Sequence, residues 1–551
     1  MTKDKLYLSF VLTALIIMSG CHRKDGNLIR YVNPLIGTGP STSSNVINNY
    51  PRPEVWGLDI PAVSIPFGMT QWTPQTRDGE DKGISPFYYG GQRIFGFRGT
   101  HWQGSLNNQD YGSFTIMPMT GYLRTFPSDR ASVYVHENEV TTPAYYSCML
   151  LNYMTLVEMT GTARSGFFKF SYAKKERGFI LITPNSNAGK GYIKVDPEKQ
   201  EIYGYNPVMD IYRDPHKSAG FSGYFVVRFQ RPMDNYGCYF QMEDLKKQTE
   251  ISGKPDIGAY AEFNIKEGDV ILAKVGTSFT SIESARANLD AEIPQWDFQK
   301  TKAETEQIWN GALSAVNLKG GKKEDYTKFY TAMYHSMLYP RTFSDVDGSY
   351  PDFKGGKLMH KMDKGHIYYD DFSLNDSRNV QFSLLRLLAP DKYEDMQKSS
   401  VLKTQQGGWM PDSIVCKNHF PYLYDLLANS SETQTIVKNK LENEYTCYDG
   451  GIPGNDDSGQ TSAWYVFSAM GFYPLSPGSV EYQLSSPIFS EVEMNLNPDY
   501  YPGKQFKMSL DGPNTSNTFN QVELNGKKIP FVIKQEDIKK GGRLKFSNSE
   551  K

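Results

Sequence analysis

The sequence has few cysteines and only one long apolar run, and both shortages exclude classes of protein. Five of the 551 residues are cysteine. Four of them, Cys148, Cys238, Cys416 and Cys447, are widely spaced and form no CxxC pair. This spacing indicates no zinc site and no disulfide framework, and it cannot choose partners for a bridge. The apolar run, Leu6–Met18, is too short to cross a bilayer as a mature helix.

An excess of charge of either sign is also lacking. Lys and Arg number 59 and Asp and Glu number 61, so the net charge is −2. A chain with this balance is not built to hold nucleic acid through counterion release, and we expect no nucleic-acid partner. Aromatic residues make up 14% of the chain. They suit carbohydrate-facing clefts and equally suit large β-sandwich cores, and the core interpretation has more weight.

The N-terminus has the pattern of an export signal. Two lysines precede the apolar run, and Ser19-Gly20-Cys21 follows it. We interpret residues 1–20 as a signal peptide. A small pair before Cys21 resembles the bacterial lipobox, so we expect lipidation at Cys21, with residues 21–26 as the lipidated N-terminus and tether. The expected location is the bacterial cell envelope, with the membrane contacted only through this lipid. The alternatives are a transmembrane anchor and a plain secreted protein.

The mature chain is long enough for two or three domains. Residues 27–280 contain short β-branched or aromatic runs separated by Gly, Pro, Asn and Asp, which predict a large β-sandwich. Residues 281–318 are amphipathic and predict a helical linker. The clearest strands of the sandwich are expected at Phe114–Met117, Tyr145–Tyr153, Gly178–Thr183, Gly223–Phe229 and Asp269–Gly276.

Helical periodicity dominates residues 319–476, and strand alternation returns over residues 477–551. In this last unit Asn525-Gly526 predicts a hairpin turn. Six helices are predicted in the helical part, at Tyr326–Leu338, Phe372–Leu388, Tyr393–Leu402, Pro421–Ala428, Ser431–Tyr445 and Gln460–Met470.

The stretch Gly451–Pro474 joins a Gly/Pro-rich turn with two adjacent carboxylates to the last of these helices. We expect Asp457 or Ser458 to cap the helix and one helix face to be buried. Asp456 and Asp457 would then lie at the positive end of the helix dipole, where ionised carboxylates can orient a water or bind a hard cation. The alternative is a capped turn with no catalytic role.

Eight stretches of the chain form an ordered set of motifs: Tyr31–Gly39, Pro66–Met69, Gly96–Trp102, Asp110–Pro118, Tyr334–Leu338, Ser344–Gly348, Gly408–Pro411 and Gly451–Pro474. No single one is specific, but together they cover nearly the whole mature chain. In this order they resemble the bacterial α-mannosidases of glycoside hydrolase family 92.

The resemblance implies a calcium-dependent, inverting exo-α-mannosidase that acts on mannose-containing glycans. It implies a multidomain α+β protein, with an N-terminal β-sandwich, a helical linker, an (α/α)6-type helical barrel and a small C-terminal β unit. Inverting hydrolysis uses a carboxylic acid and a carboxylate base roughly 6.5–9.5 Å apart. The family's base matches the Asn455–Asp457 loop, so the resemblance implies Asp457 as the base with Asp456 assisting.

Three substrate-binding residues are implied by the same resemblance. His101 and Asp110 match sandwich loops that reach the cleft, and Asp376 matches a polar residue beneath the mannose. His101 can equally be a hydrogen-bonded core histidine. The stretch Ser344–Gly348 could be a calcium loop, but it lacks the later ligands of an EF-hand and is better interpreted as a turn.

The chain departs from the family pattern between Pro411 and Tyr422. There the family has a further block of about 150 residues, which accounts for roughly half of the barrel helices and contains the general acid. We therefore expect a truncated barrel with an internal deletion. Asn375 also replaces an aromatic residue of the mannose site. The remaining carboxylates nearby, Glu432, Glu442 and Glu444, lie on a polar helix face and are interpreted as solvated surface.

Two functional hypotheses follow from this departure. The first is an active α-mannosidase of family 92. The second is a catalytically impaired member that acts as a glycan-binding lipoprotein, or a non-functional deletion product. Loss of the acid removes proton delivery that contributes on the order of 10²–10⁴ in rate.

Overall fold

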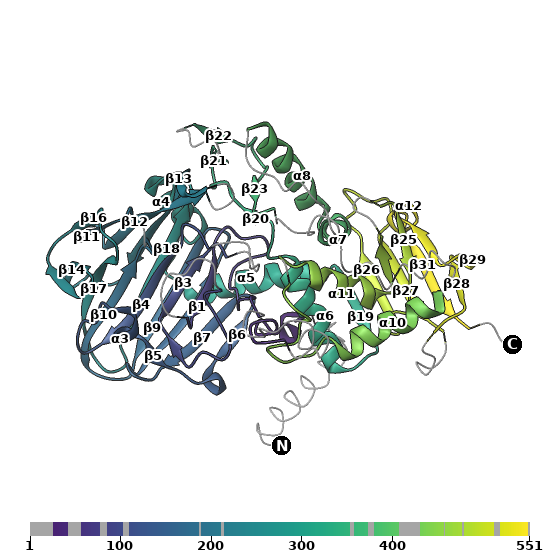
Figure 1. Cartoon of the computed structure of the whole chain (residues 1–551), viewed down its shortest axis with the longest axis horizontal. Coiled ribbons are helices and arrows are strands. Elements are labelled where there is room, and N and C mark those ends of the chain that lie inside the picture. The colour runs from purple at the N-terminus through teal and green to yellow at the C-terminus, as the bar shows by residue number, and fades with distance from the viewer. Residues whose placement is uncertain are drawn as a thin grey trace, which may run out of the picture.

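The chain folds into a β-rich N-terminal part, a central group of helices and a C-terminal β part (Figure 1). A computed structural model describes residues 26–41, 57–77, 85–102, 110–186, 189–210, 214–352, 358–372, 380–406, 422, 430–456, 458–475, 479–511 and 518–548.

Two large sheets build the N-terminal part, and they contain all five strands predicted there, although the strand predicted at Tyr145–Tyr153 ends at Leu150. The seven-stranded sheet has the order β1 (Gln71–Gln75), β3 (Gly96–Thr100), β4 (Phe114–Thr120), β10 (Glu176–Thr183), β17 (Ile257–Ile265), β14 (Asn235–Phe240) and β15 (Glu243–Lys246). The nine-stranded sheet has the order β16 (Glu250–Ser252), β11 (Tyr192–Asp196), β12 (Glu201–Asp210), β13 (Asp214–Phe229), β18 (Val270–Ser278), β9 (Ser165–Tyr172), β8 (Thr155–Gly161), β7 (Tyr145–Leu150) and β6 (Val140–Thr142).

The core between these sheets is centred on Trp72 of β1. Its ring lies edge-on to Phe114 and to Phe168, with ring centroids 5.8 and 5.3 Å apart. Gly161 and Gly166 of the opposite sheet leave room for the indole, since a Cβ on Gly166 would be 2.4 Å from the nearest ring carbon. The indole N–H donates to the carbonyl of Ser165 at 3.2 Å, so the buried polar atom is satisfied.

Two helices and one strand connect the sandwich to the rest of the chain. Helix α4 (Ile282–Glu292) packs on β18, and α5 (Phe298–Leu313) packs on β8 and β9. Ser281 caps α4, and Asp297 caps α5. Strand β19 (Val316–Lys319) was not predicted, and it pairs with β26 of the C-terminal sheet.

The C-terminal sheet has six strands, and β27 and β31 run parallel to each other. The predicted hairpin turn is confirmed, because Asn525 and Gly526 both have positive φ, at 50° and 78°, as a type I′ turn requires. The order is β19, β26 (Glu491–Asn495), β27 (Gln505–Leu510), β31 (Gly542–Ser547), β28 (Gln521–Leu524) and β29 (Lys527–Ile529). A three-stranded sheet contains β24 (Phe472–Pro474), β25 (Glu481–Leu484) and β30 (Val532–Lys534), and α12 (Gln535–Lys539) follows it.

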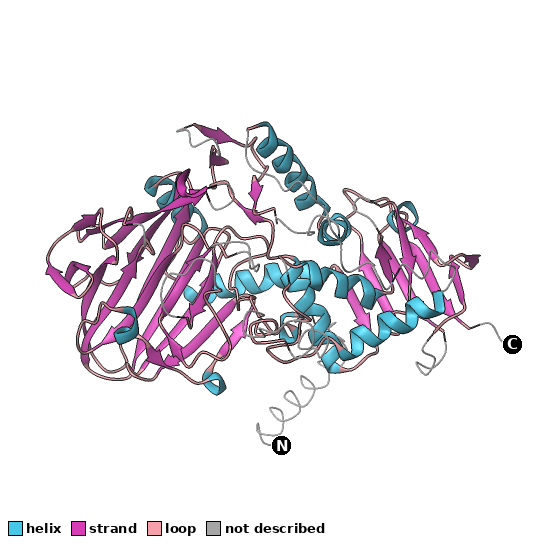
Figure 2. Cartoon of the chain, in the orientation of Figure 1, coloured by secondary structure: helices cyan, strands magenta, loops and turns pink. Residues whose placement is uncertain are grey.

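The helices lie between these β parts (Figure 2). They are arranged around α11 (Gln460–Met470), and every residue of α11 is buried. The prediction of a single buried face for this helix is therefore wrong, because other helices surround it. The partners of α11 are α6 (Lys323–Ser336), α7 (Val380–Leu388) and α10 (Ser430–Asn443), and α8 (Pro390–Gln405) packs on α7. Within the described residues these helices do not close into a twelve-helix ring, as expected for a truncated barrel.

The predicted helices agree with the observed ones to different degrees. The bounds of α11 are those predicted, and α6, α8 and α10 lie within a few residues of their predictions. Helix α7 is described over Val380–Leu388, residues 373–379 lie outside the described residues, and Phe372, the predicted start, is not helical. The helix predicted at Pro421–Ala428 lies outside the described residues except for Tyr422.

Short elements complete the structure. No helix among the described residues is long and apolar enough to cross a membrane. The short strand pairs are β2 (Arg93–Ile94) with β5 (Ser132–Val133), β20 (Arg341–Thr342) with β23 (Tyr369–Asp370), and β21 (Ser349–Pro351) with β22 (Met359–Lys361). The short helices are η1 (Ile29–Tyr31), α3 (Pro127–Arg130) and η3 (His136–Asn138).

The close contact at Trp72 predicts that adding one methyl group at Gly166 lowers the stability of the protein. Gly166→Ala should destabilise the protein by about 1–3 kcal/mol, because the added Cβ overlaps a rigid buried ring. Gly311→Ala in α5 is the matched control. Nothing lies within 4 Å of its added Cβ, and alanine favours the helix by up to about 1 kcal/mol. Urea unfolding of both variants would measure the difference, and equal stabilities would contradict the packing argument.

Candidate active site

The loop before α11 fixes one carboxylate at the start of that helix. Asp456 is 2% exposed. Its Oδ1 accepts a hydrogen bond from the backbone N–H of Ser462 at 2.8 Å, and its Oδ2 accepts from the Ser462 hydroxyl at 2.7 Å. The carbonyl of Asp456 also accepts from the N–H of Gln460 at 2.9 Å. Asp456 therefore satisfies donors of the first helical turn and is held in one orientation.

This arrangement corrects the predicted cap. The N-cap residue is Gly459 with φ of 89°, so the prediction of Asp457 or Ser458 as the cap is wrong. A left-handed glycine turns the chain sharply into the helix, and the capping carboxylate comes instead from Asp456, three residues before Gly459. The predicted end of the helix is confirmed, because Gly471 is the C-cap with φ of 95°.

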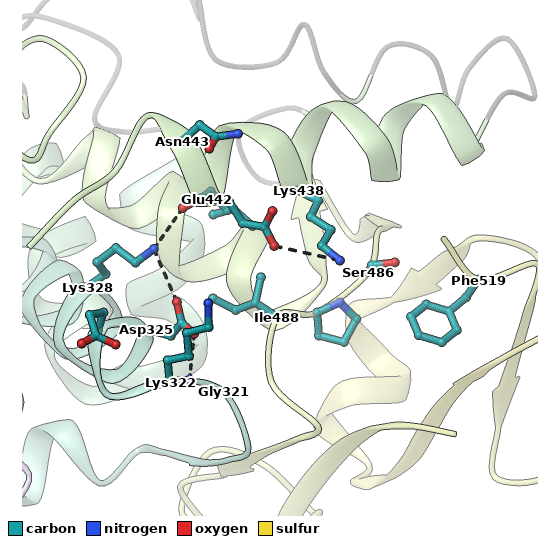
Figure 3. Close-up of a pocket in the computed structure, with 13 residues that line it drawn as sticks. Gly321, Lys322, Asp325, Lys328, Lys438, Glu442, Asn443, Ser486, Ile488 and Phe519 are labelled. Atoms are coloured by element: carbon teal, nitrogen blue, oxygen red, sulfur yellow. Dashed lines mark hydrogen bonds and ion pairs between the residues drawn. The ribbon is translucent and has the colours of Figure 1, made fainter. Parts of the chain in front are cut away.

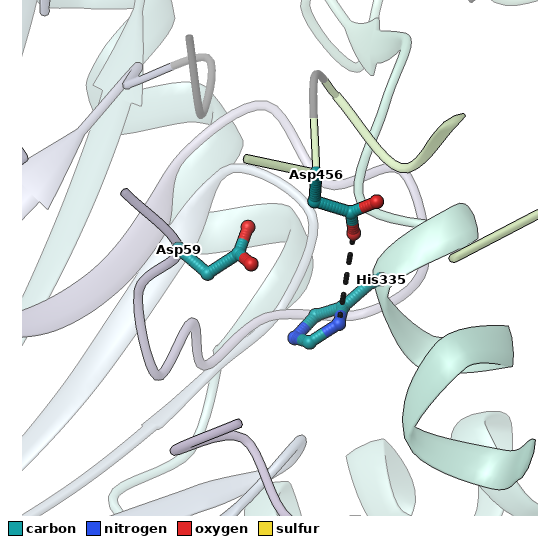
Figure 4. Close-up of side chains that lie close together, drawn as sticks. All are labelled: Asp59, His335 and Asp456. Atoms are coloured by element: carbon teal, nitrogen blue, oxygen red, sulfur yellow. Dashed lines mark ion pairs between the residues drawn. The ribbon is translucent and has the colours of Figure 1, made fainter. Parts of the chain in front are cut away.

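Two residues from distant segments converge on Asp456. His335, at the C-terminal end of α6, has Nδ1 3.7 Å from Oδ2 of Asp456. Asp59 belongs to the segment before β1, and one ligand atom from each of the three residues lies within 4.8 Å of the others. Figure 4 shows both carboxylates on the same side of the imidazole. Burial lowers the pKa of His335 to about 3, so its ring is neutral.

The second group of polar residues contains His101 and Asp110, and both are buried. Asp110 forms an ion pair with Arg98 at 3.1 Å and accepts from the backbone N–H of His101 at 2.8 Å. His101 donates from Nδ1 to the carbonyl of Tyr111 at 2.5 Å, and its Nε2 accepts from Thr70 at 3.2 Å. Burial, with the nearby charge of Arg341, lowers the pKa of His101 to about 4. His101 therefore has the contacts of a hydrogen-bonded core histidine.

Arg341 joins this group to the helical part. Its guanidinium donates to the carbonyl of Trp102 at 2.9 Å and also to the carbonyl of His101. It pairs with Asp371 at 2.7 Å, and the Tyr111 hydroxyl donates to the same carboxylate at 2.7 Å. The Arg341 side chain is 1% exposed. One guanidinium therefore binds the backbone at the end of β3 to the turn after β23.

Tyr339 is a buried residue near carboxylates of both groups. Its hydroxyl donates to the carbonyl of Trp102 at 3.0 Å. Burial raises its pKa, Arg341 opposes the rise, and the charges of Asp59, Asp371 and Asp456 add to it. Carboxylates of both groups therefore lie close enough to Tyr339 to affect its pKa.

Three predicted site residues, Asp457, Asp376 and Cys21, lie outside the described residues. The stretch Ser344–Gly348 contains a turn, as interpreted, in which the N–H of Gly348 donates to the carbonyl of Asp345 at 2.9 Å. The Asp345 carboxylate accepts from the hydroxyl of Ser278 at 2.9 Å and from Asn288 at 2.7 Å. It therefore holds the turn against the sandwich.

A separate cavity of about 750 Å³ lies between α6, α10 and residues 486–488 (Figure 3). Two ion pairs line it: Lys328 contacts Asp325 at 3.4 Å, and Lys438 contacts Glu442 at 4.0 Å. The Glu442 side chain is 56% exposed, which agrees with its interpretation as solvated surface. None of the residues around Asp456 lines this cavity.

Models of known protein families match both halves of the chain. The model of the glycosyl hydrolase family 92 N-terminal domain matches residues 31–278. The model of the family 92 catalytic domain matches residues 284–418 and 416–550. The chain belongs to glycosyl hydrolase family 92. The two catalytic-domain segments of this family 92 chain meet between Pro411 and Tyr422, where the sequence predicts the missing block.

Solved structures of family 92 share the fold. A family GH92 inverting mannosidase from Bacteroides thetaiotaomicron is 21% identical, with a TM-score of 0.77 over 95% of this chain and 97% of that one. A second GH92 α-mannosidase from the same organism is 20% identical, with a TM-score of 0.78 and 95% of each chain covered. An uncharacterized secreted glycosidase of Arthroderma benhamiae is 23% identical over 370 residues, which are 61% of this chain and 45% of that protein. This chain therefore spans less than half the length of that curated relative.

The calcium that family 92 resemblance implies can be tested against the cluster at Asp456. Calcium takes six to eight oxygen ligands, whereas this cluster contributes an imidazole and two carboxylates. Moreover, both Asp456 oxygens already accept hydrogen bonds from Ser462. These residues do not fit calcium.

The spacing within the cluster also limits its chemistry. An inverting pair needs its carboxyl groups roughly 6.5–9.5 Å apart, so that a water fits between base and sugar. The ligand oxygens of Asp59 and Asp456 are within 4.8 Å. Asp59 is therefore too close to serve as the acid opposite Asp456.

Neither Asp59 nor His335 was predicted as a site residue. His335 lies in the Tyr334–Leu338 stretch that contributes to the family resemblance, and this stretch was the only available signal. Asp59 is separated from Asp456 by most of the chain and lies in no motif, so only the fold brings them together.

The Arg341 contacts predict a large loss of stability in one variant. Arg341→Met leaves Asp371 buried without its guanidinium and should cost about 3–5 kcal/mol. Lys361→Met is the matched control, since Lys361 pairs with Asp347 at 2.9 Å and both side chains are more than half exposed. That change should cost less than about 1 kcal/mol. Urea unfolding would compare the two, and similar losses would show that Arg341 does not hold the parts together.

Proposed function

We propose that the chain is an α-mannosidase that hydrolyses terminal α-mannosides of glycans with inversion at the anomeric carbon. In this proposal Asp457 is the base that activates water, and Asp456 assists. Asp376 contacts the bound mannose. His101 and Asp110 support the wall of the site from beneath, because each is at most 2% exposed and bonded within the sandwich.

The observation that carries the proposal is the match of both family 92 domain models, in order, over nearly the whole chain. The titles of the solved structures agree with it. One describes an inverting mannosidase, and another describes an α-mannosidase in complex with mannoimidazole. The fold that this chain shares with them contains the loop on which the proposed base lies.

The geometry at Asp456 supports different roles for the adjacent residues Asp456 and Asp457. Ser462 holds the Asp456 carboxylate from two sides, and the side chain is buried. Such a carboxylate contributes a fixed negative charge beside the reacting water, which favours a positively charged transition state. Proton abstraction then falls to Asp457, the next residue along the loop.

Two substrates whose leaving groups differ in acidity distinguish catalysis by the base from catalysis by the acid. With base chemistry alone, an aryl α-mannoside should be cleaved, because its phenolate leaves without protonation. An α-linked mannobiose should be cleaved at least about 10²-fold more slowly, since its alkoxide needs a proton. Product release measured for both substrates, with NMR of the first-formed anomer, would test the activity and its inversion.

Variants assign the activity to the loop. Asp457→Asn should lower turnover of the aryl mannoside by about 10²–10⁴-fold. Asp347→Asn, on an exposed turn, is the control and should retain full activity. Equal cleavage of both substrates would show that an acid is present. Absence of release from either substrate would refute the enzyme and leave the catalytically impaired binder.

We also propose that the protein is exported and held at the cell envelope by a lipid on Cys21. The Ser19-Gly20-Cys21 sequence after a short apolar run supports this, and the Arthroderma benhamiae relative is described as secreted. Cys21→Ser should move the protein from the membrane fraction to the soluble fraction of cells. Immunoblotting of fractionated cells would measure this, with Cys447→Ser as the control. An unchanged distribution would contradict lipid attachment.

A further inference from the structure

His136 has a hydrogen-bond acceptor at each of its two ring nitrogens. It lies in η3, between β5 and β6, the edge strand of the nine-stranded sheet (Figure 1). Nδ1 is 2.6 Å from Oε2 of Glu139, and Nε2 is 2.8 Å from the carbonyl oxygen of Tyr89. An ionised carboxylate and a carbonyl oxygen only accept, so both nitrogens must carry a proton. Imidazole is the stronger base of the pair, and His136 is therefore positively charged in this arrangement.

The neutral ring would have a different best partner. If Nε2 lost its proton, its lone pair would face the carbonyl oxygen of Tyr89 at 2.8 Å, and the two acceptors would repel each other. The hydroxyl of Tyr134 is 3.5 Å from the same nitrogen and can donate to it. Deprotonation therefore removes the bond to Tyr89 and favours a ring that turns toward Tyr134.

Negative charges near the ring favour its protonated form. The Glu139 side chain is 1% exposed and also accepts from the Tyr146 hydroxyl at 2.6 Å. Glu137 and Asp449 add two further negative charges. Burial disfavours the charge on His136, but the hydrogen bond and the charge of Glu139 outweigh burial, and the pKa of His136 is raised above 6.5. The neutral titratable groups that face the ring are Tyr89, Tyr134 and Tyr146.

The carbonyl that His136 binds belongs to the segment between β1 and β2. Phe87 of this segment is buried in the same apolar core as the central helices. The Tyr89 ring stacks on the imidazole, with ring centroids 4.1 Å apart. The N–H of Tyr89 donates to the carbonyl of Thr38 at 3.0 Å. One side chain at the edge of the sandwich therefore holds a segment that packs on the helical part.

The residue after Thr38 connects this segment to the loop of the proposed base. The N–H of Gly39 donates to the carbonyl of Asp449 at 3.1 Å, and the N–H of Gly37 donates to the same carbonyl at 2.7 Å. Gly39 also lies against the Asp449 carboxylate, which leaves no room for a Cβ. Burial raises the pKa of Asp449, and the charge of His136 opposes this rise. Asp449 stands two residues before Gly451, where the loop begins.

We propose that His136 is a pH-dependent clamp between the edge of the sandwich and residues 85–91. In its charged form the imidazole holds these residues, and through them it keeps residues 38–39 against Asp449. In its neutral form it releases them. A local change of charge thus acts on a contact between the two parts of the protein. The proposal goes beyond the mannosidase function, because it concerns the attachment of this segment and not turnover.

The clamp predicts how stability depends on pH. Folding raises the pKa of His136 above its unfolded value of 6.5, so the clamp stabilises the protein fully below pH 6.5. This contribution is lost as the pH rises through the folded pKa. His136→Gln should therefore lower the urea midpoint at about pH 6 and lower it less at about pH 9. His366→Gln is the matched control, with one carboxylate partner at 2.7 Å and a half-exposed side chain, and it should change the midpoint little at either pH.

Hydrogen exchange tests the clamp in the full chain. Exchange at the ring carbon between the two nitrogens, read by mass spectrometry, reports the pKa of each histidine without a variant, and His136 should titrate above 6.5. The amides of residues 85–91 should exchange faster, relative to their intrinsic rates, above this pKa than below it. A folded pKa one unit above 6.5 makes the opening about 10-fold easier at high pH. Glu139→Gln removes the partner charge and should abolish the difference.

Three results would each overturn the proposal. His136 titrates at or below 6.5, or the amides of residues 85–91 keep the same pH dependence in Glu139→Gln, or His136→Gln lowers the midpoint equally at both pH values. If His136→Gln fails to fold, ring exchange in the wild type and amide exchange in Glu139→Gln still decide the question. Loss of mannosidase activity alone would not bear on the clamp, since each measurement reports the histidine or the segment it holds.

Discussion

The buried guanidinium of Arg341 is the contact on which the assembly of this protein most depends. It donates to two backbone carbonyls at the end of β3 and pairs with Asp371 after β23, so a single side chain spans the sandwich and the helical part. Burying a charge costs free energy unless every donor has a partner. The buried Arg341 is therefore stable only when the sandwich and the helical part are packed together. Tyr339 lies next to it and contacts the carbonyl of Trp102. These contacts therefore join the end of β3 to the segment that follows α6.

Much of the fold could be predicted from the sequence because its signals are local. The buried strands, the Asn525-Gly526 turn and the bounds of α11 each depend on residues close together in the chain. The domain architecture was predicted from the family resemblance, and the truncated helical barrel was predicted from the departure from it. The failures come from contacts between distant segments. Strand β19 exists because β26 is beside it, and α11 is buried all round because of α6, α7 and α10.

The site was predicted in part for the same reason. The importance of the loop at Asp456 was visible from its glycines and carboxylates, but the capping role passed from the expected residues to Asp456 once Gly459 adopted a left-handed conformation. His101 and Asp110, which the resemblance implies as substrate-binding residues, are buried and hydrogen-bonded to each other. Asp59 and His335 could not be predicted as site residues, because only the folded structure brings them to the loop that contains Asp456.

The pairing of β19 with β26 has a consequence for how the catalytic part could lose helices. Because Lys319 pairs with Glu491, the whole helical stretch between them is a loop whose ends are joined by a sheet. The entropy of closing such a loop depends only on the logarithm of its length, and halving it changes the free energy by only about 0.6 kcal/mol. A large internal segment can therefore disappear from the middle without separating the two β parts. The pairing of β19 with β26 therefore keeps the end of the helical linker and the C-terminal sheet together, whatever the length of the helical stretch between them.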